Sequence, residues 1–489
     1  MYLGIDLGTS GVKVLLIDAE QRAVGQANAS LDVSRPHSGW SEQAPAHWLT
    51  ACGEAMDALK ASHGRELAAV RGIGLSGQMH GATLLGEDDS VLRPCILWND
   101  TRSHAEAGEL DADPRFRAIS GNIVFPGFTA PKLVWVACNE PDVFRKTRKI
   151  LLPKDYLRLW LSGEYLSEMS DSSGTSWLDT GARAWSGELL AACDLDVGQM
   201  PALVEGTQAA GGLRSELAQR WGMKAGIPIA GGAGDNAASA VGTGATREGE
   251  AFVSLGTSGV IFAANDGFRP LPSSAVHTFC HALPGRWHQM GVILSATDSL
   301  NWMAGICGVE ASQLAAGLGD EAGAPGPEIF LPYLSGERTP HNDAAIRGSF
   351  AGLSHASDRR ALTLAVMRGV AFALRDNLAA LKDAGTSLSR VTAVGGGSRS
   401  ALWLSIIATT LDLAVDIPAD GDFGAAFGAA RLGLIAAEGA RPDDVCTAPA
   451  IARTIGPDAG LRAAYEDSYH HYRALYPAIR GATTQGEKQ

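Results

Sequence analysis

The hydrophobic residues of the chain fall into short runs that enter and leave glycine-rich turns. Apolar runs at Tyr2–Leu7 and Val12–Ile17 flank one turn, and runs at Ala251–Leu255 and Val260–Ala264 flank another. A short apolar run on each side of a tight turn is typical of two paired strands. The pattern therefore predicts a β-hairpin at each place.

The two turns also share an identical hexamer. Leu-Gly-Thr-Ser-Gly-Val stands at Leu7–Val12 and again, about half the chain later, at Leu255–Val260. Turns rich in Gly, Ser and Thr are common, so coincidence is the alternative explanation. Identity within matching hairpins favours two related domains, each opening with a hairpin whose turn faces a shared cleft.

Further apolar runs alternate with helical spacing. The runs at Val70–Leu75, Ile227–Gly231 and Val391–Val394 predict short strands, each leading into a glycine-rich segment. Ala361–Leu381 carries its apolar residues at the spacing of one helix face. Alternating strands and helices predict an α/β protein with mainly parallel sheets covered by helices.

Two polar or small-residue segments predict connections at the surface, Ala209–Gly212 and Gly317–Gly326. The natural boundary lies near residue 245, shortly before the second hexamer. We therefore expect an N-terminal domain of residues 1–244 and a C-terminal domain of residues 245–489.

Composition narrows the class of protein. The 489 residues are 46% hydrophobic and carry a net charge of −13, without a basic run. This balance gives no electrostatic reason to bind nucleic acid or an anionic membrane. The chain has seven cysteines with no two close together, no signal-like N-terminus and no long apolar stretch. We expect a soluble, cytoplasmic protein.

The glycine turns are candidate phosphate-binding loops. Backbone N–H groups in such a turn converge on one point, and hydroxyls such as that of Thr9 add donors. Two turns from two domains would grip a polyphosphate. Asp6 stands beside the first turn, where a carboxylate is unfavourable unless a cation such as Mg²⁺ intervenes. The alternative is that Asp6 caps its own turn.

Asp235 is the candidate base. It follows the predicted strand Ile227–Gly231 in a run of small residues, where open α/β sheets place their chemistry. A carboxylate there would take the proton of a hydroxyl nucleophile. The alternative is a turn-forming pair of Asp235 and Asn236.

Two other motifs offer surfaces for a polyol. Gln78, Met79 and His80 combine an amide, an apolar surface and an imidazole after a strand end, and Trp98 adds an aromatic floor. A structural role is the alternative for each. The histidines of Val276–His281 fit no standard zinc spacing, so this segment is interpreted as an alternating strand.

Seven motifs occur in the order found in a known family. They are Asp6–Lys13, Gly77–Gly81, Ile96–Asp100, Gly127–Trp135, Gly234–Asn236, Leu255–Gly259 and Gly395–Gly397. Together they resemble the FGGY carbohydrate kinases, to about residue 435. Three further segments, Ser34–His37, Leu151–Tyr156 and Phe330–His341, resemble the members that act on xylulose.

The resemblance implies two actin-like, ribonuclease-H-like ATPase domains flanking a central cleft. It implies transfer of phosphate from ATP, with Mg²⁺, to the 5-hydroxyl of D-xylulose, and a homodimer. The N-terminal domain would bind the ketopentose and supply the base, and the C-terminal domain would bind the nucleotide.

The resemblance also implies roles for single residues. Asp235 would be the base, with Asp6 as the second catalytic carboxylate, and both would lie at the metal. Four residues would bind the sugar: Met79, His80, Trp98 and Asn236. Six would bind the nucleotide: Thr9, Lys13, Gly256, Thr257, Gly396 and Gly397. A solvated strand lysine is the alternative for Lys13.

Three rival functions remain open at this stage. A kinase of the same family acting on ribulose or another ketose is the nearest. An ATP-driven conformational protein like actin or the heat-shock chaperones would need the phosphate turns but no sugar pocket. A sugar-sensing regulator would have lost catalysis, which the presence of both Asp6 and Asp235 disfavours.

Overall fold

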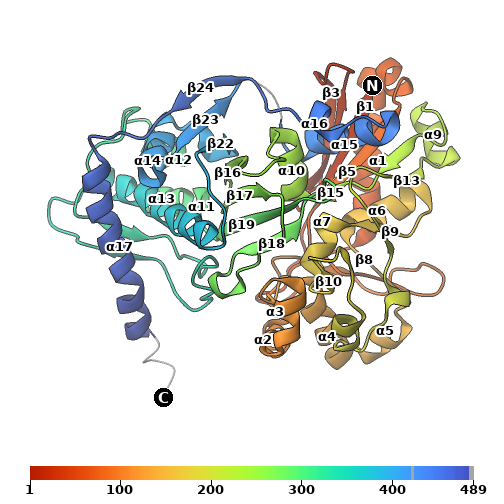
Figure 1. The fold of residues 1–489 in the computed structure, drawn as a ribbon, viewed down its shortest axis with the longest axis horizontal. Helices are drawn as coiled ribbons and strands as arrows, with labels where there is room; N and C mark the ends of the chain where they lie inside the picture. The colour runs from red at the N-terminus through yellow and green to blue at the C-terminus, as the bar shows by residue number, and fades with distance from the viewer. Residues whose placement is uncertain (420–422, 484–489) are drawn as a thin grey trace.

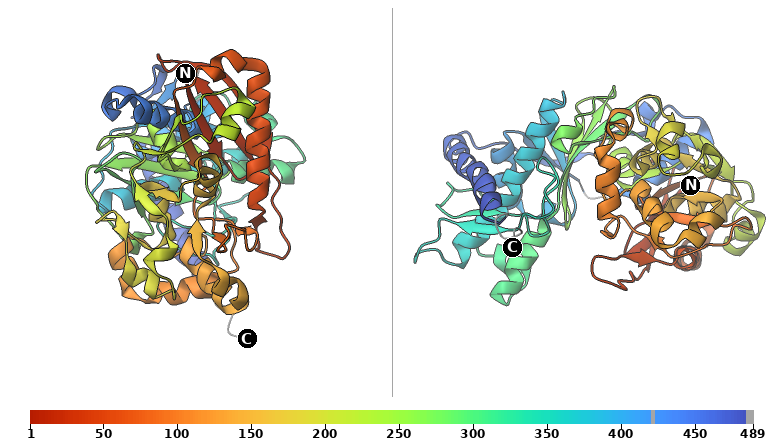
Figure 2. Two further views of the ribbon diagram at one scale, coloured as in Figure 1. Left: turned by 90° about the vertical axis from the view of Figure 1, so that its right-hand side faces the viewer. Right: turned by 90° about the horizontal axis from the view of Figure 1, so that it is seen from below.

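Two seven-stranded sheets organise the computed structural model, which describes residues 1–419 and 423–483. The first sheet contains the N-terminal hairpin and the second contains its repeat. The two halves lie side by side, as the view from below shows most clearly (Figure 2).

The first sheet combines antiparallel and parallel pairing. Strands β3, β2 and β1 pair antiparallel, and β1, β5 and β14 pair parallel. The edge strand β13 pairs antiparallel with β14, and the short β15 pairs parallel with β5. In spatial order the strands are β3 (Ala23–Ser30), β2 (Gly11–Ile17), β1 (Tyr2–Leu7), β5 (Gly72–Gly77), β14 (Pro228–Ala230) and β13 (Ala209–Gly212), with β15 (Ala233–Gly234) beside β5.

The second sheet repeats this arrangement. Antiparallel pairing from β19 through β17 to β16 is followed by parallel pairing through β22 to β23 and an antiparallel edge strand, β24. In spatial order the strands are β18 (His277–Cys280), β19 (Trp287–Ile293), β17 (Gly259–Asn265), β16 (Ala251–Leu255), β22 (Arg390–Val394), β23 (Ala414–Pro418) and β24 (Ile451–Ile455). The two predicted hairpins are confirmed, and the common strand order agrees with two related domains.

Helices cover both faces of the first sheet. Apolar side chains of β1 and β2 alternate between two buried clusters, one shared with α1 and the other with α10 and α15. The covering helices are α1 (Pro45–Ala68), α6 (Pro153–Ser162), α9 (Ser215–Trp221), α10 (Asp235–Thr243) and α15 (Ala425–Glu438).

Helix α15 comes late in the sequence but packs on the first sheet, where Figure 1 shows it in blue beside the red strands. Glycines make this close approach possible: a Cβ on Gly4 would lie 1.9 Å from Ala426 O, and one on Gly74 would lie 1.7 Å from Ala429 O. The two halves of the sequence therefore interlock in space, and the boundary near residue 245 stays a prediction.

The second sheet has helices on one face and the first half of the chain on the other. Its largest apolar cluster is shared by α11 (Thr297–Cys307), α12 (Ala311–Ala315), α13 (Arg359–Asp383), α14 (Ala401–Leu411) and α17 (Arg462–Thr483). On the opposite face, Phe252 and Met290 cluster with Met79 and Phe128 of the first half. This contact joins the two halves next to the predicted sugar motif.

The remaining elements are small or peripheral. Most of them lie between β5 and β13 in the sequence. The helices are α2 (His104–Ala112), α3 (Pro114–Ser120), α4 (Thr129–Asn139), α5 (Pro141–Lys146), α7 (Met169–Ser172), α8 (Gly187–Ala191) and α16 (Pro442–Val445). The two-stranded pairs are β4 (Glu42–Gln43) with β7 (Cys95–Ile96), β6 (Thr83–Leu85) with β8 (Lys149–Leu151), β9 (Leu166–Glu168) with β12 (Ala202–Val204), β10 (Leu178–Asp179) with β11 (Ala184–Trp185), and β20 (Ile329–Leu331) with β21 (Ser349–Ala351).

One predicted element is wrong. Ala209–Gly212 was expected as a surface connection but forms β13, the edge strand paired with β14. Its alanines and glycines resemble a loop in composition, while backbone hydrogen bonds to a neighbouring strand define it as a strand. The predicted strand at Val391–Val394 and helix at Ala361–Leu381 are confirmed within β22 and α13. Among the described residues, no helix is both long and apolar enough to span a membrane.

Candidate active site

A cavity of about 260 Å³ lies where the two sheets meet, at the small end of the range for small-molecule sites. Met79, His80, Trp98, Asp235 and Asn236 line one side, all from the first half of the chain. The second half contributes Gly256 of the repeated turn. The structure thus brings together six of the twelve predicted site residues around one space.

Asp235 stands at the beginning of a helix. It follows β15 and is the first residue of α10, where helix N–H groups and the dipole favour a carboxylate. Its Oδ1 accepts hydrogen bonds from the backbone nitrogen of Asn236 at 2.7 Å and from Asn236 Nδ2 at 3.0 Å. Burial, aided by the charge of Asp6 and opposed by these hydrogen bonds, raises the pKa of Asp235 to about 6.

Asp6 lies behind the cavity, near the end of β1. It stands between Lys13 on β2 and Ser76 on β5, its partners in the sheet. Burial raises the pKa of Asp6, with Ser76 and Lys13 opposing the shift, while burial lowers the pKa of Lys13 and Asp6 opposes that change. Asp6 Oδ1 is buried and has no hydrogen-bond partner among the described residues.

An unpartnered carboxylate oxygen close enough to Asp235 to raise its pKa fits a cation between the two side chains. Within the described part of the chain, no group of three or more His, Cys, Asp or Glu side chains forms a metal cage. The donors present suit an ion that uses few protein carboxylates.

Thr9 connects the first glycine turn to the sugar motif. Its hydroxyl donates to Gln78 Oε1 and accepts from Trp98 Nε1, both at 2.9 Å. Gln43 Nε2 also donates to the Thr9 carbonyl at 2.7 Å, and Gln78 Nε2 donates to Gln43 Oε1 at 3.0 Å. The turn, Trp98 and the strand end of β5 are therefore held as one unit. The sequence analysis missed Gln43, which lies far from every motif.

His80 has a fixed tautomer. Its backbone is left-handed, with φ 69°, and its carbonyl accepts from Lys132 Nζ at 2.8 Å and Thr129 Oγ1 at 3.2 Å. The ring stacks on Phe128, and Nδ1 lies 2.8 Å from Gly174 O. Because a carbonyl only accepts, Nδ1 carries the proton and Nε2 is an acceptor. Burial, with the charge of Lys132, lowers the pKa of His80 to about 3, so the ring is neutral.

The second repeated turn is tied to a helix. Gly256 O accepts from the backbone nitrogen of Thr297 at 2.9 Å and from its hydroxyl at 2.7 Å, and Thr257 O accepts from Ala296 N at 2.8 Å. Gly397 lies so close to this turn that a Cβ would stand 2.8 Å from Leu255 Cβ, whereas Gly396 faces open space. Thr257, Gly396 and Gly397 therefore lie together outside the cavity wall.

The second half also contributes residues that the motifs did not assign. His277 and Phe279 of β18 and Arg338 line the same cavity as the sugar motif. Val276–His281 contains the predicted strand, which is β18, and two of its side chains also line the cavity. Arg338 lies within Phe330–His341, one of the segments that carried the resemblance, and this was the only signal for it.

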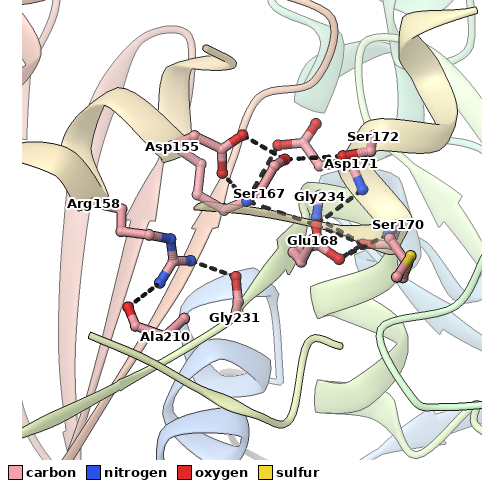
Figure 3. Close-up of polar contacts among 12 residues, drawn as sticks. Asp155, Arg158, Ser167, Glu168, Ser170, Asp171, Ser172, Ala210, Gly231 and Gly234 are labelled. Atoms are coloured by element: carbon pink, nitrogen blue, oxygen red, sulfur yellow. Dashed lines mark hydrogen bonds and ion pairs between the residues drawn. The ribbon is translucent and has the colours of Figure 1, made fainter. Parts of the chain in front are cut away.

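A buried charged cluster lies close to Gly234, the residue before Asp235, and Figure 3 shows its carboxylates Asp155, Glu168 and Asp171. We define the Lys154 cluster as Lys154, Asp155, Glu168 and Asp171, whose side chains are all fully buried. Lys154 Nζ lies 2.7 Å from Asp155 Oδ1, 3.6 Å from Glu168 Oε1 and 3.5 Å from Asp171 Oδ2. Burial opposes the charge of Lys154, but the carboxylates together raise its pKa.

The cluster connects to the backbone around Asp235. Glu168 accepts from Ser170 N at 2.7 Å, and the Ser170 hydroxyl accepts from Gly234 N, one residue before Asp235, at 3.1 Å. Nearby, Arg158 donates to Ala230 O at 2.8 Å (Figure 3 shows its other contacts). Buried ionic groups hold the segment that carries the candidate base.

Comparison with known proteins agrees with this geometry. Residues 1–242 match the family model for the N-terminal domain of the FGGY family of carbohydrate kinases, and residues 251–437 match its C-terminal domain. The chain belongs to this family. It is a carbohydrate kinase, a phosphotransferase, and ATP is the phosphate donor that the family implies.

Several relatives match over nearly their whole length. The chain is 48% identical to the xylulose kinase of Escherichia coli K12, covering 98% of this chain and 99% of that protein. It is 50% identical to the xylulose kinase of Klebsiella pneumoniae, covering 89% and 90%. A crystal structure of a "xyloylose kinase" from Brucella ovis is 66% identical, with a TM-score of 0.97 over 98% of this chain and 99% of that one. The α/β architecture with two domains is thereby confirmed.

Proposed function

We propose that this carbohydrate kinase transfers the γ-phosphate of Mg-ATP to the 5-hydroxyl of D-xylulose, giving D-xylulose 5-phosphate and ADP. The observation that carries the proposal is Asp235, a carboxylate of raised pKa on a cavity that also presents Met79, His80 and Trp98. Relatives named xylulose kinase match almost the whole chain and support the choice of sugar.

Asp235 would act as the general base. Asn236 fixes one carboxylate oxygen of Asp235, leaving the other for the substrate. As the 5-oxygen of the sugar bonds to the γ-phosphorus, its proton passes to Asp235, and the bond to the β,γ-bridging oxygen breaks to release ADP.

Asp6 would hold Mg²⁺ through a water, and Asp235 would lie beside the ion with its free oxygen turned to the substrate. The unpartnered Asp6 Oδ1 and the repulsion between the two carboxylates are the features that fit a cation. When bound, Mg²⁺ would neutralise phosphate charge during transfer. Removal of the ion should therefore abolish turnover without unfolding the protein.

The sugar would lie between Trp98 and the Met79–His80 corner. His80 Nε2 is an acceptor for a sugar hydroxyl, because Nδ1 is committed to Gly174. Asn236 would contribute a polar contact beside the base. Met79 and Trp98 offer apolar surface to the carbon chain.

The nucleotide would lie across the two glycine turns. Thr9 and Lys13 would face the phosphates from the first half, and Gly256 and Thr257 from the second. Gly396 and Gly397, packed beside the second turn, would line the nucleotide site. In this arrangement residues 1–244 carry the sugar and the base, and residues 245–489 carry the nucleotide.

The location and assembly belong to the proposal as well. All seven cysteines are described and all are free thiols, which supports the cytoplasm as the compartment. A homodimer is the expected assembly, and sedimentation velocity would measure it.

The test is ADP release with Mg-ATP against D-xylulose, D-ribulose, L-ribulose, L-xylulose and glycerol, with a control lacking sugar. The proposal expects the highest kcat/KM with D-xylulose and almost no release without sugar. A preference for another ketose would keep the mechanism and change the substrate. Rapid sugar-independent turnover would favour a conformational ATPase instead.

A further inference from the structure

Arg338 faces the cavity from the second half of the chain without a direct role in the proposed chemistry. Its guanidinium lies over the ring of Phe125, 4.7 Å from the centroid, and its Nη1 lies 3.4 Å from His277 Nε2. Since a guanidinium only donates, His277 Nε2 is the acceptor of this contact. Burial, with the charge of Arg338, holds the pKa of His277 well below its usual range, so the ring is neutral.

The charge of Arg338 is not matched by an ion pair. No carboxylate of the described residues lies within ion-pairing distance of its guanidinium. The adjacent Glu337 instead accepts from the backbone nitrogens of Arg338 at 2.7 Å and Leu294 at 3.2 Å. Burial raises the pKa of Glu337 to about 8, against these hydrogen bonds and the charge of Arg338. A cation in such surroundings is stabilised by an acceptor-rich ligand.

Contacts place this cation at the sugar end of the cavity. The ring of Phe128 lies between those of His80 and His277, with centroids 4.5 Å and 5.6 Å away. The charge of Arg338 helps to lower the pKa of both histidines, and its Nη1 contacts His277 directly. Arg338 therefore lies beside these histidines at the sugar end of the cavity.

We propose that Arg338 is a specificity-determining residue that donates hydrogen bonds to the 2-carbonyl oxygen of the ketose. The inference rests on the proposed function: with the 5-hydroxyl at Asp235, the carbonyl end of the chain points toward His80 and Arg338. A carbonyl only accepts and a guanidinium only donates, so the two match. A 2-hydroxyl oxygen can also accept from a guanidinium, but its own proton then needs a second acceptor, which Arg338 does not provide.

This arrangement also couples sugar recognition to the contact between the two halves. The base and His80 come from the first half, and Arg338 comes from the second. A ketose held at both ends would bridge the two halves of the chain. This closure would keep water away from the position of the 5-hydroxyl, where it could accept the phosphate instead of the sugar.

The test measures the KM of D-xylulose and the inhibition constant of xylitol, which carries a 2-hydroxyl in place of the carbonyl. Arg338→Met should raise the KM of D-xylulose about 10- to 100-fold, since a hydrogen bond to a charged group is lost, and should weaken xylitol inhibition by a clearly smaller factor. Arg338→Lys, which keeps a cationic donor, should recover part of the loss.

Arg347→Met is the matched control, because it removes a cation that is nearby in the chain and lies off the cavity wall. Among the described residues, the Nη1 of Arg347 donates only to backbone carbonyls. This substitution should leave both constants unchanged. Equal losses for D-xylulose and xylitol, an unchanged KM for D-xylulose, or a raised KM for ATP alone would overturn the proposal. Absence of D-xylulose phosphorylation by the wild type would instead contradict the proposed function.

Discussion

The chemistry at the residue scale depends on how the protein sets the charge of Asp235. Burial and the neighbouring Asp6 disfavour the ionised form, and the two hydrogen bonds from Asn236 favour it. The balance gives a pKa of about 6, higher than an ordinary aspartate and close to the working pH. A carboxylate with such a pKa is mostly ionised at neutral pH, and it is more basic than an ordinary aspartate, so it accepts a proton more readily.

The pH dependence of kcat/KM follows from this value. Because only ionised Asp235 can accept the proton, kcat/KM should fall about tenfold per pH unit on the acid side of the Asp235 pKa, which is about 6 without a bound cation and is lowered by Mg²⁺ beside it. Initial rates between about pH 5 and pH 8 at saturating Mg-ATP measure the profile. A flat profile across that range would mean that Asp235 ionises like an ordinary carboxylate or is not the base.

At the element scale, one short segment connects the parts of the site. The residues of α7 and the 3₁₀ turn after it, Met169–Thr175, reach the backbone before Asp235 through Ser170 and the His80 ring through Gly174. Ser173 also accepts from Cys280 N of β18 at 3.0 Å, which lies in the second sheet. The Lys154 cluster anchors this segment, because Glu168 caps α7.

Replacing Lys154 tests that anchor. Lys154→Met leaves buried carboxylates without their cation, so the free energy of unfolding should fall by about 3–5 kcal/mol, and kinase activity should fall with it. Urea-induced unfolding measures the stability. Arg22→Ala, which breaks an exposed pair with Asp18, is the control and should change little. Equal effects of the two substitutions would show that the cluster does not stabilise the segment.

The glycine contacts of α15 are a second feature at this scale. Gly74→Ala would place a methyl group 1.7 Å from Ala429 O, so the helix must move away from the sheet. Overpacking of this kind should lower the free energy of unfolding by about 1–3 kcal/mol or more. Gly108→Ala in α2 meets no atom within 4 Å and should be neutral or stabilising. A Gly74→Ala protein with unchanged thermal stability would contradict the tight packing.

The molecule as a whole is a repeated sheet with a site between the copies. The sequence predicted this duplication because the two hairpin turns are identical, and it predicted the strand ends because each leads into glycine. The edge strand β13 was missed, since its small residues carry no strand pattern and its pairing partner is distant in sequence. The packing of α15 on the first sheet was equally invisible from local patterns.

The candidate site was predictable to the extent that its residues lie in motifs. Met79, His80, Trp98, Asp235, Asn236 and Gly256 do line the cavity. Gln43, Lys132 and Arg338 were not assigned. Lys132 and Arg338 lie within segments that carried the resemblance, but their contacts become visible only in the fold. Single polar residues on distant segments give no spacing to recognise.

The central claim is that a carboxylate between the two halves activates the sugar hydroxyl, and Asp235→Asn tests it most directly. The measurement is D-xylulose-dependent ADP release, with the affinity for Mg-ATP determined on the same protein. We predict a loss of about 10²- to 10⁴-fold in kcat, with ATP affinity changed by less than about threefold. Sugar phosphorylation that survives the substitution, or ATP affinity that falls by the same factor as the rate, would contradict the assignment of Asp235 as the base.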